Sequence, residues 1–157
     1  MVSSDQFRQA MGNFATGITI VTTRDGNGKP YGLTVNSFTS VSLNPVLVLV
    51  CLDNKLSGIQ SFKAAKHFGV SILSEYQEDI SRMFAKKDSE RPPSIYFDGP
   101  LGMPLLKNSI AVMECEVVNV YAGGDHQIFL GEVQTAEVYP SEGALLYFRG
   151  KYRRLGN

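Results

Sequence analysis

The sequence predicts a mainly β domain with some α-helix, folded as a small antiparallel barrel, and three observations carry this prediction. Six or seven segments are rich in β-branched residues or alternate apolar with polar side chains, as strands do. Turn motifs join several neighbouring segments at hairpin distance. Only two or three short helical patterns lie between them, too few for the regular strand–helix alternation of a doubly wound sheet.

Length and composition indicate one folded domain that spans residues 1–157. A chain of 157 residues buries roughly 70% of the surface that its unfolded form exposes, enough for one core. Fifteen Lys and Arg residues balance fifteen Asp and Glu residues. This zero net charge argues against a protein whose main partner is nucleic acid, so any anionic ligand has to be bound by a local group of charges.

The sequence also predicts a cytoplasmic protein without a membrane anchor. The longest apolar run, Val46 to Leu52, is far shorter than the roughly 20 residues of a spanning helix, and the first residues do not form a secretory signal. Cys51 and Cys115 lie far apart in strand-like stretches, a pattern typical of buried, reduced thiols.

The first elements are a helix and a hairpin. Ser3 and Gln6 form a capping-box pattern, and the apolar residues that follow predict a helix that Gly17 ends. Ile18–Thr23 is β-branched throughout and runs into an Asp-Gly-Asn-Gly turn. The chain from Tyr31 to Ser42 is then expected to be extended again.

The middle of the chain alternates strands with short helices. After a turn at Asn44-Pro45, the apolar run described above predicts a strand covered on both faces. Ser57 is expected to cap a helix that holds Ile59 and Phe62, and a strand follows over Phe68–Leu73. Ser74 and Gln77 then form a second capping-box pattern before Ile80, Met83 and Phe84.

The last third begins with a long connection and continues with strands. Residues Lys86–Pro104 collect charges, four prolines and two glycines, which predicts a long ordered loop or flap. Apolar alternation from Ala111 to Val118 predicts a strand. Gly123-Gly124-Asp125-His126 turns the chain into a strand over Gln127–Val138, and Leu145–Phe148 is the last predicted strand.

Several common chemistries have no signature in the sequence. There is no dinucleotide-binding glycine motif, no P-loop and no G-x-S-x-G elbow, and Gly26–Pro30 is better explained as a hairpin turn. His67 and His126 have no partners at metal-ligand spacing, so no metal site is expected. His67 lies at a helix-to-strand junction and is expected to be structural.

Three segments are candidates for binding. In the hydroxyl-rich stretch Thr34–Ser42, alternation puts Thr34, Asn36 and Ser40 on one face, where they could hydrogen-bond a planar polar ring or a phosphate. The same alternation directs Leu33, Val35 and Val41 to the core. The alternative, which we favour when this segment is taken alone, is a Thr-rich strand edge.

The second and third candidates also have structural alternatives. Lys55 brings a positive charge and Ser57 precedes a helix whose free N–H groups favour an anion, but an N-cap beside a solvated lysine is an equally good interpretation. The Gly-Gly turn projects His126, which could donate a hydrogen bond or change its charge near pH 7. A histidine in such a turn is usually just exposed.

Taken together, the motifs resemble those of short-chain flavin reductases, the reductase components of two-component monooxygenases. The motifs occur in the family's order and cover nearly the whole chain: FRQAMGNFATG at 7–17, TVNSFTSVS at 34–42 followed by Pro45, GGDHQIFLG at 123–131 and LLYFRGKY at 145–152. The sequence departs from the family pattern at Ser71, where asparagine is common, and at Val46, where a second proline is common.

The resemblance implies a split β-barrel, that is, an antiparallel Greek-key barrel with short flanking helices. It also implies a homodimer with FMN or FAD near the subunit interface and hydride transfer from NADH or NADPH to that flavin. The residues implied to bind the cofactors are Thr34, Asn36, Ser37 and Ser40 for the ring and ribityl chain, Cys51, Asp53, Lys55 and Ser57 for the ribityl phosphate, Leu73 and Ser74 beside the same cofactor, and His126 and Tyr152 on the nicotinamide side.

The expected function is therefore an NAD(P)H-dependent flavin reductase that releases reduced flavin to a separate oxygenase. No acid–base pair is required, because the flavin carries the redox chemistry. Two alternatives stay open: a flavoprotein that reduces ferric chelates or another acceptor, and a flavin-binding module without catalysis.

Overall fold

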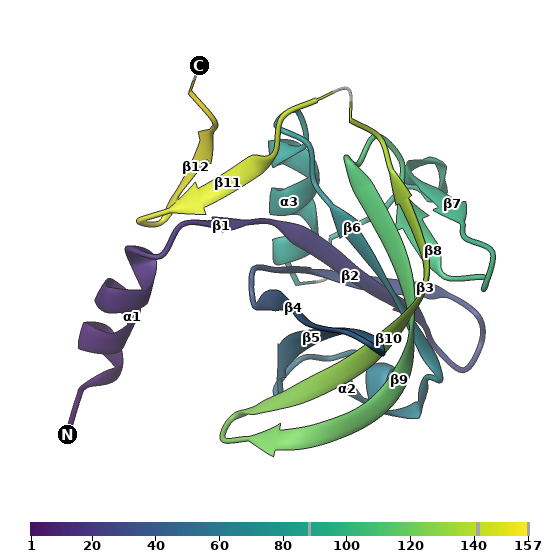
Figure 1. The fold of residues 1–157 in the computed structure, drawn as a ribbon, viewed down its shortest axis with the longest axis horizontal. Helices are drawn as coiled ribbons and strands as arrows, with labels where there is room; N and C mark the ends of the chain where they lie inside the picture. Colours follow the sequence, from purple (N-terminus) through teal and green to yellow (C-terminus); the bar gives the residue numbers. More distant parts are fainter. Residues whose placement is uncertain (88, 141, 157) are drawn as a thin grey trace.

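The computed structural model describes residues 1–87, 89–140 and 142–156 and shows a mainly β protein with short helices (Figure 1). The helices are α1 (Ser4–Gly12), α2 (Ile59–Ala64), α3 (Glu78–Ala85) and the 3-10 turn η1 (Pro93–Ile95). The strands are β1 (Thr16–Gly17), β2 (Thr19–Arg24), β3 (Pro30–Val35), β4 (Phe38–Leu43), β5 (Val46–Asp53), β6 (His67–Ile72), β7 (Tyr96–Asp98), β8 (Pro104–Leu106), β9 (Ala111–Gly123), β10 (His126–Val138), β11 (Leu145–Phe148) and β12 (Lys151–Arg154).

The strands form one large sheet and two small ones. The seven-stranded sheet has the order β3-β2-β6-β9-β10-β5-β4, and β1-β11-β12 and β7-β8 form the small sheets. Every pairing between these strands is antiparallel, which confirms the predicted class. The two predicted hairpins, β2–β3 and β9–β10, are also confirmed. Closure of the large sheet into a split barrel stays a prediction.

Two buried clusters form the core. The larger lies against the seven-stranded sheet and includes Phe62 of α2, Phe68 of β6 and Phe129 of β10, with Phe62 packed edge-on against Phe129. The second gathers Ile20 and Leu73 with side chains from α3, β8 and β11. Burial of such apolar side chains is the main favourable contribution to folding.

The N-terminal helix is capped as predicted but ends early. The Ser3 hydroxyl accepts a hydrogen bond from the Gln6 backbone N–H and the Gln6 side-chain oxygen accepts one from the Ser3 backbone N–H, so the capping box is confirmed. The helix ends at Gly12 rather than Gly17, because the chain from Thr16 pairs with β11 instead. None of its residues is buried, and Figure 1 shows α1 standing away from the sheet.

Three predicted segments are organised differently. The extended stretch Tyr31–Ser42 is interrupted at residues 36–37, which separates β3 from β4. The apolar run in β5 alternates between buried side chains and half-buried ones within this chain, so the prediction of cover on both faces is wrong here. The predicted loop Lys86–Pro104 contains η1, β7 and the start of β8.

Both predicted caps in the middle of the chain are wrong. Gly58, not Ser57, is the N-cap of α2, and no side chain caps that helix. Gln77 is the N-cap of α3, again without a capping side chain. Half of the second capping box survives, because the Gln77 side chain accepts a hydrogen bond of 3.0 Å from the Ser74 backbone.

The β7–β8 turn is held by a buried carboxylate. Glu114 of β9 is fully buried and accepts hydrogen bonds from the backbone N–H groups of Leu101 and Met103 and from the hydroxyl of Thr135. These bonds tie the turn to the β9–β10 hairpin. Cys51 and Cys115 are free thiols, as predicted. In the residues that the structure describes, no helix is both long and apolar enough to span a membrane.

Candidate functional site

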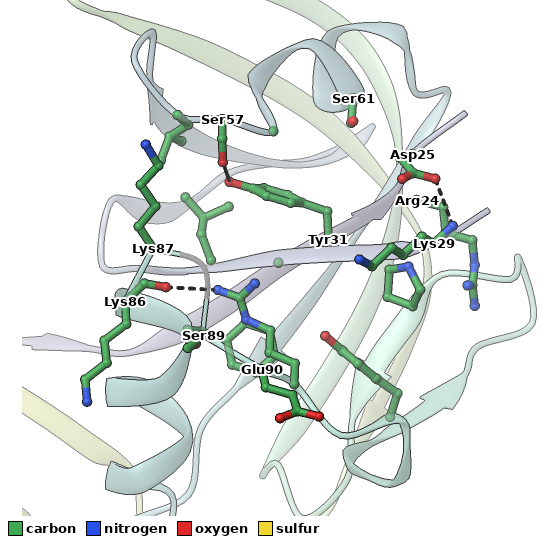
Figure 2. Close-up of a pocket in the computed structure, with 18 of the residues that line it drawn as sticks. Arg24, Asp25, Lys29, Tyr31, Ser57, Ser61, Lys86, Lys87, Ser89 and Glu90 are labelled. Atoms are coloured by element: carbon green, nitrogen blue, oxygen red, sulfur yellow. Dashed lines mark hydrogen bonds between the residues drawn. The ribbon is translucent and has the colours of Figure 1, made fainter. Parts of the chain in front are cut away.

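A cavity of about 1200 Å³ lies beside β3 (Figure 2). Its walls come from β3, from the loop between β5 and α2, and from the segment between α3 and β7. Among its lining residues are Lys29, Tyr31, Gly32, Leu33, Lys55, Leu56, Ser57, Ser61, Phe84, Lys86, Lys87, Glu90, Arg91, Tyr96 and Asp98. A cavity of this size accommodates a nucleotide-sized ligand.

The cavity carries an excess of positive charge. Six Lys or Arg residues line it against three Asp or Glu residues, although the whole chain is neutral. Arg24 is neutralised by Asp98, whose carboxylate lies 2.5 Å from the guanidinium. Across 1–87, 89–140 and 142–156, the other cations, which are Lys29, Lys55, Lys86, Lys87 and Arg91, form no ion pair. The site therefore favours an anionic ligand.

Arg91 is the most constrained of these cations. Its guanidinium stacks 4.7 Å above the ring of buried Phe84 and donates one long hydrogen bond, 3.3 Å, to the Lys86 carbonyl. Its Nε is buried and has no hydrogen-bond partner among the described residues. A buried donor without a partner is costly, and an anion in the cavity would supply one.

Two of the predicted phosphate-binding residues, Lys55 and Ser57, line this cavity. Figure 2 shows the Ser57 side chain pointing to the Tyr31 hydroxyl, and the two hydroxyl oxygens lie 3.5 Å apart. Asp53 accepts a 2.8 Å hydrogen bond from the Lys55 backbone and so shapes the loop, and Cys51 is half-buried in β5. Burial raises the pKa of the Cys51 thiol.

The predicted ring-binding residues lie at and around the β3–β4 break. Thr34 donates a 2.6 Å hydrogen bond to the Ser81 carbonyl of α3, and Ser37 donates one of 2.8 Å to the Cys51 carbonyl. Asn36 and Ser40 are exposed. Val41 is exposed too, so its predicted place in the core is wrong; a register shift between Ser40 and Ser42 breaks the alternation.

Leu73 and Ser74 are buried next to α3. Leu73 belongs to the second core cluster, and Ser74 bridges to Ala144. Both are at most 1% exposed, so in this chain their side chains contact protein rather than an open cavity.

His126 begins β10, directly opposite Asp53 of β5. Its Nδ1 lies 2.7 Å from the Asp125 carboxylate, and this hydrogen bond lowers the pKa of Asp125. Asn54 fixes the turn, because its backbone N–H donates to the Asp125 carbonyl and its side chain accepts from Gln127. The imidazole is thus held at a strand end and remains partly exposed.

Tyr152 lies elsewhere in the fold. Its hydroxyl is 2.8 Å from that of Ser81, Arg82 stacks on its ring, and it lines a second cavity of about 370 Å³. Figure 1 places β11–β12 and the β9–β10 turn at opposite ends of the chain's fold. One chain therefore does not bring Tyr152 and His126 together.

Sequence reasoning missed Lys29, Lys87 and Arg91. Figure 2 shows Lys29 and Lys87 on opposite sides of the cavity. The available signal was the charge collected in the Asp-Gly-Asn-Gly-Lys turn and in the Lys86–Pro104 segment.

The structure thus combines an antiparallel β fold with a basic cavity large enough for a nucleotide. The family model described as "Flavin reductase like domain" matches residues 11–156, and the chain belongs to this family. The resemblance seen in the motifs is therefore confirmed, and the protein is a flavin reductase.

Curated relatives agree with this assignment. An NADH-dependent FAD reductase of Streptomyces globisporus is 43% identical over 157 residues, covering 95% of this chain and 84% of the relative. The reductase component of a flavin-dependent trigonelline monooxygenase of Acinetobacter baylyi is 38% identical, covering 94% of this chain. This chain spans 47% of that relative's length.

Solved structures show the same fold. The NADH:FAD oxidoreductase of Streptomyces globisporus C-1027, solved with NAD and FAD fragments, has a TM-score of 0.92 and 38% identity, covering 99% of this chain and 96% of that one. The flavin reductase PheA2 in its native state has a TM-score of 0.90 and 40% identity, covering 99% and 100% of the two chains.

Proposed function

We propose that this flavin reductase takes a hydride from NADH, transfers it to FAD or FMN, and delivers the reduced flavin to a separate oxygenase. The basic cavity supports the choice of flavin nucleotides, because Lys55 and Ser57 line it and can bind the phosphate of a flavin nucleotide. The named relatives support NADH as the hydride donor and an oxygenase as the partner, since they include an NADH-dependent FAD reductase and monooxygenase reductase components.

The residues present fit a flavin nucleotide. Lys55 and Ser57 offer a charge and a hydroxyl to the phosphate, and Asn36, Ser37 and Ser40 offer neutral polar groups to the ring and ribityl chain. Thr34 supports this segment through its bond to Ser81. The bound flavin supplies the hydride acceptor, so the protein has to bind, orient and shield it.

His126 positions the nicotinamide in this proposal. The Asp125 hydrogen bond and the Asn54 contacts hold the imidazole at the end of β10, from which it can contact the donor. His126→Ala should therefore lower turnover partially and raise the KM for NADH, with little change in flavin affinity. Wild-type values for both kinetic parameters would contradict this role.

The active species in this proposal is a homodimer. The α1 helix exposes Phe7 and Met11 by 59% and 49%, and Phe14 beyond its end is also exposed. A nine-residue helix with no buried residue is marginal in water on its own, so a second copy that covers its apolar face would stabilise it. A dimer also allows His126 of one protomer and Tyr152 of its partner to border one site.

The deciding experiment is an oxidation assay that crosses NADH and NADPH with FAD, FMN and riboflavin. We expect NADH oxidation that depends on added flavin and stoichiometric reduction of that flavin. No flavin-dependent oxidation with any of the six pairs would overturn the proposed activity. Reduced flavin that stays bound to the protein during gel filtration would overturn only the proposed delivery to a separate oxygenase.

A double variant tests the ring-binding residues. Asn36→Ala with Ser40→Ala removes two exposed polar side chains and should weaken flavin binding, since each lost hydrogen bond costs about 0.5–1.5 kcal/mol. The exposed neighbour Thr39→Ala is the matched control. Flavin titrations that match the wild type in the double variant would refute this assignment.

A further inference from the structure

Residues 86–87 and 89–93, between α3 and β7, include the part of the cavity wall that sequence reasoning missed most. They contribute Lys87 and Arg91, and neither is needed to hold a single phosphate beside Ser57. Figure 2 shows Lys87 and Lys29 on opposite sides of the cavity, so its cations are not gathered at one point. Cations distributed along a cavity fit an extended anion better than a compact one.

Arg91 is prepared to bind such an anion. Stacking on Phe84 fixes the plane of the guanidinium, and Phe84 is itself fixed by burial and by an edge contact to Tyr96. Most of the guanidinium's donors are unused by the described residues: one N–H reaches the Lys86 carbonyl at 3.3 Å, and Nε has no partner. A rigid guanidinium with available donors matches a phosphate group in geometry and charge.

Resting on the proposed function, we propose that Arg91 is a specificity-determining residue that binds the AMP-side phosphate of FAD and so makes this enzyme select FAD over FMN. The cavity volume of about 1200 Å³ supports this, because it exceeds what a ribityl phosphate alone would fill. Lys87 adds positive charge on the same wall.

The test measures dissociation constants of FAD, FMN and riboflavin by flavin fluorescence for the wild type and Arg91→Gln. Loss of a charge-assisted hydrogen bond should weaken FAD binding about tenfold. FMN and riboflavin binding should change less than about twofold. Lys66→Gln, which removes a charge outside the cavity, is the control and should leave all three constants unchanged.

Two results would overturn the proposal. If FAD and FMN binding were weakened equally, Arg91 would bind the phosphate that the two flavins share. If the dissociation constant of FAD were unchanged, Arg91 would not contact the flavin. Both are distinct from failure of the proposed function, in which the wild type reduces no flavin at all.

A second measurement uses the wild-type protein and covers the case in which Arg91→Gln does not fold. ADP carries the AMP half of FAD with both phosphates, so it should displace bound FAD in a titration without nicotinamide. It should leave bound riboflavin in place. ADP that displaces neither flavin, or both equally, would contradict a separate subsite for the AMP half.

Discussion

At the scale of single residues, Glu114 links the core to the wall of the cavity. Its carboxylate is fully buried and accepts hydrogen bonds from three groups, two of which are backbone N–H groups of the β7–β8 turn. Strand β7 in turn supplies Tyr96 to the cavity. Removal of this carboxylate would leave these part-buried donors without their partner.

Glu114→Ala is therefore expected to lower the free energy of unfolding by about 2–4 kcal/mol. Urea denaturation followed by circular dichroism measures this change. Glu116→Ala is the matched control, because Glu116 lies on the same strand, is half-exposed, and its carboxylate lies 3.8 Å from the exposed Lys66 amine. A loss for Glu114→Ala no greater than that of the control would contradict the role of the buried carboxylate.

The two cysteines should differ in reactivity. Burial, helped by the neighbouring Glu114 charge, raises the pKa of the Cys115 thiol from 9.0 to about 12, whereas Cys51 is half-buried. At pH 8 a thiol reagent should label Cys51 in the native protein and Cys115 only after unfolding. The folded Cys51→Ala variant should then not be labelled by the reagent. Rapid labelling of that variant would contradict the burial of Cys115.

The same thiol has a defined effect on stability. Since Cys115 keeps its proton in the folded state up to about pH 12 but loses it near pH 9.0 when unfolded, its contribution to stability is complete below pH 9.0. That contribution decreases as the pH rises from 9.0 towards about 12.

At the scale of elements, β10 approaches β6 and β9 closely at Gly131. A Cβ built on Gly131 would lie 2.5 Å from the Phe68 ring and 3.0 Å from the Cys115 Cβ. Both of these side chains are buried, so neither can move away easily. The glycine is required there by packing.

Gly131→Ala should destabilise the protein by about 1–3 kcal/mol, the usual cost of overpacking a core. Thermal unfolding measures the change as a lower Tm. Gly26→Ala in the β2–β3 turn is the control, because a Cβ there has no atom within 4 Å. An equal Tm for the two variants would show that the Phe68 contact is not a constraint.

The elements that the sequence predicted are those whose signal is local. The β2–β3 and β9–β10 hairpins carry turn residues between strand-forming segments, and the capping box marks the start of α1. The short strand β12, Lys151–Arg154, is mostly charged and has no apolar alternation, so only its pairing with β11 defines it. The predicted caps of α2 and α3 were wrong; before α3, the chain at Ser74 and Glu75 is instead held by pairing with Ala144 and Gly143.

Some residues of the candidate site could likewise be predicted from local sequence, and others could not. Lys55 and Ser57 are close in sequence and could be predicted as a pair, and the structure brings both to the cavity. Lys29 and Arg91 come from segments about sixty residues apart and line one cavity only because the fold brings the start of β3 and the chain after α3 to it. Such convergence is a property of the fold and has no local sequence signature.

At the scale of the whole molecule, the exposed face of α1 predicts a change in assembly on mutation. Phe7→Ser with Met11→Ser removes the apolar surface that a second copy would cover, so we expect the dimer to dissociate and activity to fall. Sedimentation velocity at assay concentrations measures the change. Arg8→Ser, on the same helix but polar, is the control. A fully active wild-type monomer would refute the dimer.

The basic cavity has a consequence for how far the protein's electric field reaches. Because the whole chain is neutral, the positive excess in the cavity is balanced by a negative excess elsewhere, and the molecule is a dipole. A dipole's potential falls faster with distance than that of a net charge, and at 0.1 M salt it is screened within about 10 Å. Flavin anions are therefore recruited only at close range: added salt should change how tightly they are held much more than how often they arrive.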